Sequence, residues 1–100
     1  MKIRNQDKEA LVRIFSDSPM SFEIWAYGSR VNGEAHDASD LDLVVRSKNQ
    51  EPVPIKQYAD WLEKIQESNI PILVQLFDWT RIPESFKKSI LINHEVLFEK

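Results

Sequence analysis

The sequence predicts an α/β (α+β) domain, because segments with helical periodicity alternate along the chain with segments that favour strands. Apolar residues recur at helical spacing within residues 5–16 and 55–67. Residues 21–27 and 41–46 are instead rich in strand-forming residues. Residues 71–77, PILVQLF, form a continuous apolar run that is followed by an aspartate. Such a run is typical of a strand buried on both faces, so we expect strands and helices packed around one sheet.

The first helix is expected over residues 5–16 and should end near Ser18 and Pro19. The apolar positions that share one face of this helix are Ala10, Leu11, Ile14 and Phe15. In the following segment, SFEIWAY, apolar and polar side chains alternate over residues 21–27. This alternation predicts a half-buried strand.

Gly28 interrupts the first strand, and a short helical turn is expected from Ser29 onward. A polar loop over residues 33–39 leads into the second strand, LDLVVR, at residues 41–46. The next segment, SKNQEPVP, contains two prolines and several polar residues, which indicates a second loop.

The last part of the chain predicts two further helices and a closing strand. Residues 55–67 place apolar side chains on one face, so they should form a long helix. A third helix is expected over residues 80–93, with Thr80 as its cap, an early proline, and apolar side chains four positions apart at Ile82, Phe86 and Ile90. Residues 95–99, EVLFE, should add a short edge strand.

Length and composition limit the classes of protein that this chain can belong to. One hundred residues suit a single domain, spanning residues 1–100. The net charge of -3 and the lack of a basic cluster argue against a nucleic-acid binder. The absence of cysteine excludes disulfides and thiolate zinc sites and fits a cytoplasmic protein. We expect neither a signal peptide nor a membrane span.

Two aspartates stand at the start of the second expected strand. Residues two apart on a strand point to the same face. Asp40 and Asp42 would therefore present two carboxylates on one face, with their Cα atoms about 7 Å apart. Two anions this close raise each other's pKa unless a cation lies between them. Mg²⁺ binds one or two carboxylates and completes its shell with water and substrate phosphates. The pair therefore indicates a magnesium site.

The first expected strand ends at Gly28 and Ser29, which together could hold a phosphate. Glycine allows close approach of the backbone, and free backbone N–H groups with a hydroxyl can donate to phosphate oxygens. Taken alone, a Gly-Ser turn is common and Asp40 or Asp42 could simply face solvent. The order strand, Gly-Ser, spacer, Ser-Asp-x-Asp, strand is far more specific than either part.

The segment GSRVNGEAHDASDLDL, residues 28–43, resembles the signature of the minimal nucleotidyltransferases of the DNA polymerase β superfamily. The resemblance implies a mixed, twisted sheet of three to four strands with helices largely on one side. It implies that Asp40 and Asp42 are catalytic and bind two Mg²⁺ ions. The residues that it implies for nucleotide binding are Gly28, Ser29, Arg30, Gly33 and Ser39, with Arg30 on a phosphate and Gly33 serving the turn.

The chain departs from this family at the position of a third carboxylate. The family supplies that acid from a later strand in a stretch that reads like VDL, where this chain has Gln75 between Val74 and Leu76. An amide can offer a neutral oxygen but cannot carry charge or accept a proton as a carboxylate does. Asp78, three residues on, is the candidate to supply this catalytic carboxylate instead, provided that the strand ends or bulges there and so turns it to the same face.

The resemblance implies an enzyme that transfers a nucleoside monophosphate from a nucleoside triphosphate, with ATP expected, to an acceptor. The implied acceptor is a helical HEPN-type protein, with this chain as the antitoxin of a toxin-antitoxin pair. Gln75 favours an alternative, in which a catalytically impaired module neutralises its partner by binding. A homodimer is also compatible with so small a chain.

Overall fold

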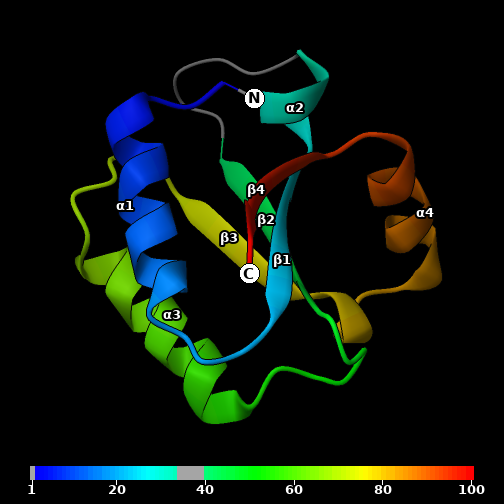
Figure 1. Ribbon diagram of the computed structural model, residues 1–100. Helices are drawn as coiled ribbons and strands as arrows, with labels where there is room; N and C mark the ends of the chain where they lie inside the picture. Colours follow the sequence, from blue (N-terminus) through cyan, green and yellow to red (C-terminus); the bar gives the residue numbers. More distant parts are fainter. Residues whose placement is uncertain (1, 34–39) are drawn as a thin grey trace.

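The computed structural model describes residues 2–33 and 40–100, and these residues contain a four-stranded sheet with the strand order β3-β2-β1-β4. β1 pairs antiparallel with β2 and with β4, while β2 and β3 run parallel. The sheet is therefore mixed, which confirms the predicted fold class (Figure 1). Its strands are β1 (Phe22–Tyr27), β2 (Leu41–Ser47), β3 (Val74–Asp78) and β4 (Glu95–Glu99).

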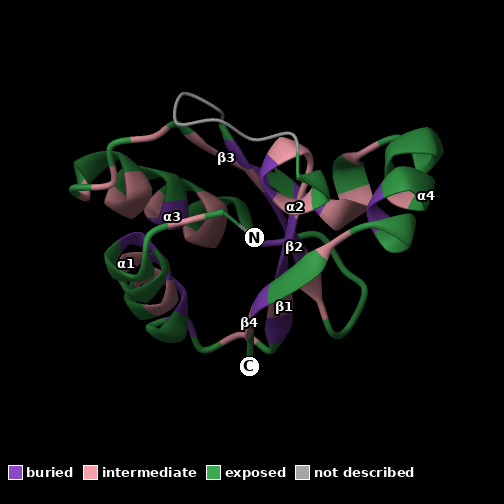
Figure 2. Cartoon of the chain, turned by 90° about the horizontal axis from the view of Figure 1, so that it is seen from above, coloured by how far each residue is buried: buried purple, intermediate pink, exposed green. Residues whose placement is uncertain are grey.

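Helices cover both faces of the sheet unequally. The two long helices, α1 and α3, lie on one face, and α4 lies on the other (Figures 1 and 2). A single helical turn, α2, follows β1 directly, as the sequence predicted. The helices are α1 (Asn5–Ser16), α2 (Ser29–Asn32), α3 (Ile55–Glu67) and α4 (Glu84–Ile92), with a 3₁₀ turn, η1, at Trp79–Arg81. Among the described residues, no helix is long and apolar enough to cross a membrane.

The main core lies between the sheet and the two long helices. Phe15 of α1, Phe22 of β1 and Trp61 of α3 are fully buried there. The ring centroid of Trp61 lies 5.4 Å from that of Phe15 and 5.0 Å from that of Phe22. Aromatic side chains bury large apolar areas, and pairs in tilted or edge-to-face geometry add further stabilisation. These three rings therefore hold α1 and α3 on the sheet.

A smaller cluster lies on the opposite face, under α4. Trp25 of β1, Val44 of β2 and Ile90 of α4 are its buried members. Tyr27, Trp79 and Ile82 pack against them. Cover on this face therefore comes from α4 and from the segment of η1 and Ile82 that precedes it.

The apolar run at residues 71–77 is an edge strand, so the prediction that it is buried on both faces was wrong. β3 pairs only with β2 among the described strands. Leu73 is 60% exposed and Phe77 is 39% exposed. A run of apolar residues shows that a segment favours a strand, but the position in the sheet depends on pairing partners distant in the sequence.

The third helix is shorter than predicted, and Thr80 does not cap it. The η1 turn at Trp79–Arg81 precedes α4, and Pro83 occupies the N-cap position of α4. The side chain of Asp78 accepts the Thr80 N–H and so caps the 3₁₀ turn. A proline close to a helix start is favoured because its missing N–H has no intrahelical partner there, which explains why α4 begins only after Pro83.

Candidate functional site

The site lies at the start of β2, which pairs antiparallel with β1 on one edge and parallel with β3 on the other. Asp42 lies directly opposite Tyr27 of β1 and opposite Gln75 of β3. Its neighbours Leu41 and Leu43 are fully buried in the main core. Because side chains alternate along a strand, Asp42 points to the opposite face, the one that carries α4. Asp40 precedes β2 and is exposed.

Gly28 brings the turn after β1 into contact with this aspartate. Its backbone has φ 81° and ψ −155°, a conformation that is essentially restricted to glycine. A Cβ atom at position 28 would lie 2.6 Å from Oδ2 of Asp42. The first half of the motif therefore lies close to the second half, and a side chain at position 28 would require Asp42 to shift. Ser29 follows as the first residue of α2.

Burial and repulsion both act on Asp42. Burial raises the pKa of this carboxyl above its usual range, and the neighbouring charge of Asp40 raises it further. The pKa of Tyr27 rises to about 12, mainly through burial and also through the charge of Asp42. The motif residues read from the sequence did not include Tyr27. Its position at the end of a strand, immediately before the Gly-Ser turn, was the available signal.

Gln75 lies next to both Asp40 and Asp42. Its Nε2 donates a hydrogen bond to Oδ2 of Asp40 at 3.2 Å, while its Cα is the register partner of Asp42. A neutral amide donor eases the crowding of two carboxylates without adding charge. The structure therefore places Gln75 where a third side chain can contact whatever the two acids hold.

Asp78 is not brought together with Asp40 and Asp42. β3 is paired regularly with β2 through Asp78, which lies opposite Val45, so Asp78 faces the side opposite to Gln75. The carboxylate is buried and accepts the Val53 N–H at 2.8 Å, the Thr80 N–H at 2.9 Å and the Thr80 hydroxyl at 2.8 Å. Arg81 Nε lies 3.7 Å from it. The expectation that Asp78 supplies the third acid does not fit this placement, because its oxygens already hold the chain around η1.

The remaining motif residues have different environments. Arg30 is buried, and its guanidinium donates to the Lys2 carbonyl oxygen at 2.7 Å. This contact holds the N-terminal segment, and the phosphate contact of Arg30 stays a prediction. Gly33 ends α2 in the left-handed conformation, in keeping with its expected role in the turn. Ser39 lies outside the described residues.

The donor set can be tested for its fit to Mg²⁺. Among residues 2–33 and 40–100, no group of three or more His, Cys, Asp or Glu side chains converges as a metal site. Mg²⁺ needs fewer, since it is commonly bound by one or two carboxylates together with water and substrate phosphates. Asp40 and Asp42 supply those two carboxylates. The residues present therefore fit Mg²⁺ bound together with a phosphate ligand.

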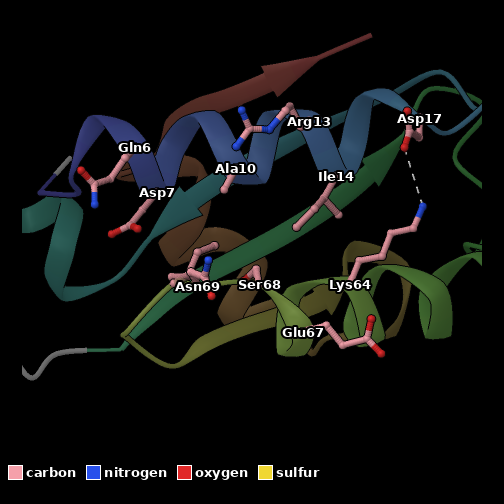
Figure 3. Close-up of a pocket in the computed structure, with 11 residues that line it drawn as sticks. Gln6, Asp7, Ala10, Arg13, Ile14, Asp17, Lys64, Glu67, Ser68 and Asn69 are labelled. Atoms are coloured by element: carbon pink, nitrogen blue, oxygen red, sulfur yellow. Dashed lines mark ion pairs between the residues drawn. The ribbon is translucent and has the colours of Figure 1, made fainter.

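A cavity of about 580 Å³ lies elsewhere, between α1 and the end of α3 (Figure 3). Its lining carries both signs of charge, with Asp17 and Lys64 forming an ion pair at 3.8 Å. Both helices pack on the face of the sheet opposite to Asp42. This cavity is therefore separate from the acid pair.

Comparison with known proteins identifies the family. The family model described as polymerase beta, nucleotidyltransferase matches residues 9–100. The chain belongs to the polymerase β nucleotidyltransferase family. This assignment confirms the resemblance drawn from the Gly-Ser and Asp-x-Asp motifs and makes the chain a nucleotidyltransferase by family.

A curated relative and two solved structures are similar over most of the chain. The relative, "Probable protein adenylyltransferase MntA" from Haemophilus influenzae, is 32% identical over 100 residues, which cover all of this chain and 86% of the relative. A toxin-antitoxin crystal structure with AMP-PNP matches 93% of this chain and 73% of its own, with TM-score 0.72 and 18% identity. The toxin-antitoxin MntA-HepT structure matches 97% of this chain and 74% of its own, with TM-score 0.68 and 14% identity. At these identities the two structures show a shared fold.

Gly28→Ala should destabilise the fold more than Gly33→Ala does. Both glycines have positive φ, but a Cβ at position 33 meets no atom within 4 Å, whereas one at position 28 meets Asp42. We expect a loss of about 1–2 kcal/mol of unfolding free energy for Gly33→Ala from backbone strain alone. Gly28→Ala should cost about 3 kcal/mol, because a steric clash adds to the strain. Urea unfolding measures both, and equal losses would contradict the close approach of Gly28 to Asp42.

Asp78→Ala tests whether this buried acid is structural. Removing the carboxylate leaves the Val53 and Thr80 donors without their partner, so the free energy of unfolding should fall by about 2 kcal/mol or more. Asp17→Ala removes an exposed acid and should change stability by less than about 0.5 kcal/mol. Denaturant melts of the two variants decide the question. A loss for Asp78→Ala no larger than that for Asp17→Ala would show that its hydrogen bonds do not support the fold.

Proposed function

We propose that this chain, acting as one minimal domain, transfers AMP from ATP to a protein acceptor and uses Mg²⁺ to do so. The close approach of Gly28 to the Asp42 carboxylate, where an added Cβ would lie 2.6 Å from Oδ2, is the observation that carries this proposal. It joins a turn suited to phosphates to an acid pair suited to a metal that binds phosphates. The adenylyltransferase name of the 32% identical relative supports the choice of AMP as the transferred group.

The roles of the residues follow from their chemistry. The backbone N–H groups after Gly28, with the hydroxyl of Ser29, would donate to the triphosphate, and Asp40 and Asp42 would hold Mg²⁺. When bound, Mg²⁺ would orient the acceptor oxygen and stabilise charge on the leaving pyrophosphate. The acceptor oxygen forms its bond to the α-phosphorus as the bond to pyrophosphate breaks. The proton of the acceptor passes to a carboxylate of the site or to water.

The acceptor that we propose is a HEPN-type protein, with this chain as the antitoxin. The structural match to the MntA-HepT toxin-antitoxin pair supports this choice of partner. Gln75 supports a second candidate function, in which the chain neutralises the same partner by binding without transfer. With an amide in place of a third carboxylate, the site has less negative charge to hold a second cation and no acid at that position to accept a proton.

Replacing both site acids tests the nucleotide site. Asp40→Asn with Asp42→Asn should weaken Mg²⁺-dependent ATP binding by at least about tenfold, because the acids and the triphosphate share the cation. Asp17→Asn with Asp60→Asn changes the net charge equally on the other face and should bind ATP as the parent does. Titration calorimetry with and without Mg²⁺ gives both affinities. Unchanged binding in the Asp40 and Asp42 variant would remove these acids from the site.

Gln75→Asp distinguishes transfer from binding alone. A carboxylate at position 75 should raise label transfer from ATP to a HEPN-type acceptor, by up to about 10²-fold if proton acceptance limits the rate. Gln75→Asn has nearly the same shape without the charge and serves as the matched control. An inactive parent that Gln75→Asp activates would be a binding antitoxin, whereas an active parent that Gln75→Asp leaves unchanged would show that the amide suffices.

A further inference from the structure

The far end of the face that carries Asp42 holds a guanidinium between two tryptophans. Cζ of Arg46 lies 4.1 Å from the ring centroid of Trp25 and 4.5 Å from that of Trp79. Trp25 in turn stacks on His94, with centroids 3.8 Å apart and planes 9° apart. Cation–π contacts on two rings fix the plane of the guanidinium. Its edge, where the N–H groups lie, is left for other partners.

The N–H groups of Arg46 lack a partner within the described part of the chain. Nε is buried there without a hydrogen bond. None of the ion pairs between described residues includes Arg46. Guanidinium N–H groups are strong charge-assisted donors, so an anion within reach of this group would be bound favourably.

Arg46 opens into a cavity of about 400 Å³. Its lining comes from the end of β2, the loop after it, η1 and α4, and consists of Arg46, Ser47, Gln50, Trp79, Thr80 and Lys87. Two cations face this space, and no carboxylate is among these lining residues. Nζ of Lys87 lies 5.7 Å from the Trp79 ring and 3.3 Å from the exposed Glu84. The cavity is therefore cationic, with hydroxyl and amide groups at its wall.

Glu23 is the acid closest to Arg46 in the sheet register, and it is engaged elsewhere. The two residues are direct partners between β1 and β2. The carboxylate of Glu23 accepts the indole N–H of Trp25 at 3.4 Å and does not form an ion pair with Arg46 in the described structure. Glu23 also lies outside the cavity lining. Glu23 therefore lies beside the guanidinium without lining the cavity or forming an ion pair with Arg46.

We propose that this cavity binds a carboxylate of the polypeptide acceptor, and so docks the acceptor on the face that carries Asp42. The guanidinium fork matches a carboxylate bidentately, and Lys87 adds a second charge. Arg46 lies four residues along β2 from Asp42, about 13 Å away. An acceptor anchored here can present a hydroxyl to the acid pair. This inference rests on the proposed transfer to a protein.

The surface between the two sites favours a protein rather than a nucleic acid. α4 packs over Val44, which lies between Asp42 and Arg46 along β2. Its outer side exposes the apolar residues Phe86, Leu91 and Ile92. A polypeptide can cover such side chains, whereas a nucleic acid needs a longer row of cations than the two found here.

Titration with a short polyglutamate peptide, followed by NMR of the indole N–H groups, tests the proposal. The signals of Trp25 and Trp79 should shift, while Trp61, which is buried in the other core, should not. A polyglutamine peptide of equal length should shift none of them. Arg46→Gln should weaken peptide binding about tenfold, and Arg46→Lys should restore only part of it, because it keeps the charge but loses the fork. Lys87→Gln should weaken it severalfold.

Further measurements distinguish a carboxylate from a phosphate as the bound group, and the docking site from the proposed transfer of AMP. Inorganic phosphate or a single-stranded oligonucleotide that binds more tightly than polyglutamate would overturn the choice of a carboxylate. Absence of shifts at Trp25 and Trp79, or equal weakening by Lys64→Gln on the opposite face, would overturn the site. An equal loss of ATP affinity in Arg46→Gln would assign the cavity to the nucleotide. Peptide binding that persists in a parent unable to bind ATP with Mg²⁺ would remove the proposed transfer and retain the docking site.

Discussion

The antiparallel register of β1 and β2 is the constraint on which the site depends. This register sets Tyr27 opposite Asp42, so that the next residue, Gly28, turns against the carboxylate. A slip of one residue would turn Asp42 into the main core and expose its apolar neighbours Leu41 and Leu43. The large cost of burying a carboxylate without partners opposes that slip. Burial of the apolar side chains on one face of β2 therefore determines where Asp42 lies on the other face.

The two faces of the sheet differ in what they carry: one buries most of the apolar core, and the other carries Asp42 and Arg46. One face buries Phe15, Phe22 and Trp61 beneath two long helices and provides most of the apolar contact. The other face buries a smaller cluster, in which Ile90 of α4 packs with Trp25 and Val44. The acids lie at the beginning of β2 and Arg46 near its end. This separation keeps opposite charges on one rigid strand without allowing them to neutralise each other.

Local sequence signals predicted much of this structure, and pairing between distant segments decided the rest. The strand ending at Tyr27, the turn at Gly28 and the acids at its side follow from spacing within a short stretch. The edge position of β3 does not, because a continuous apolar run looks the same in a central strand and in an edge strand. Asp78 carried a usable signal, since an acid two residues before Thr80 is suited to capping a turn. Its partner Val53 comes from a loop distant in the sequence, which local spacing could not show.

The neutral side chain of Gln75 limits the negative charge that gathers around Asp40 and Asp42. A third carboxylate next to Asp40 and Asp42 would add repulsion to a pair in which the pKa of Asp42 is already raised. The amide instead donates to Asp40 and lowers the local concentration of negative charge. If Mg²⁺ and a triphosphate bind as proposed, a third carboxylate would instead stabilise the metal. Under the proposed function, an amide at this position would therefore weaken the binding of Mg²⁺.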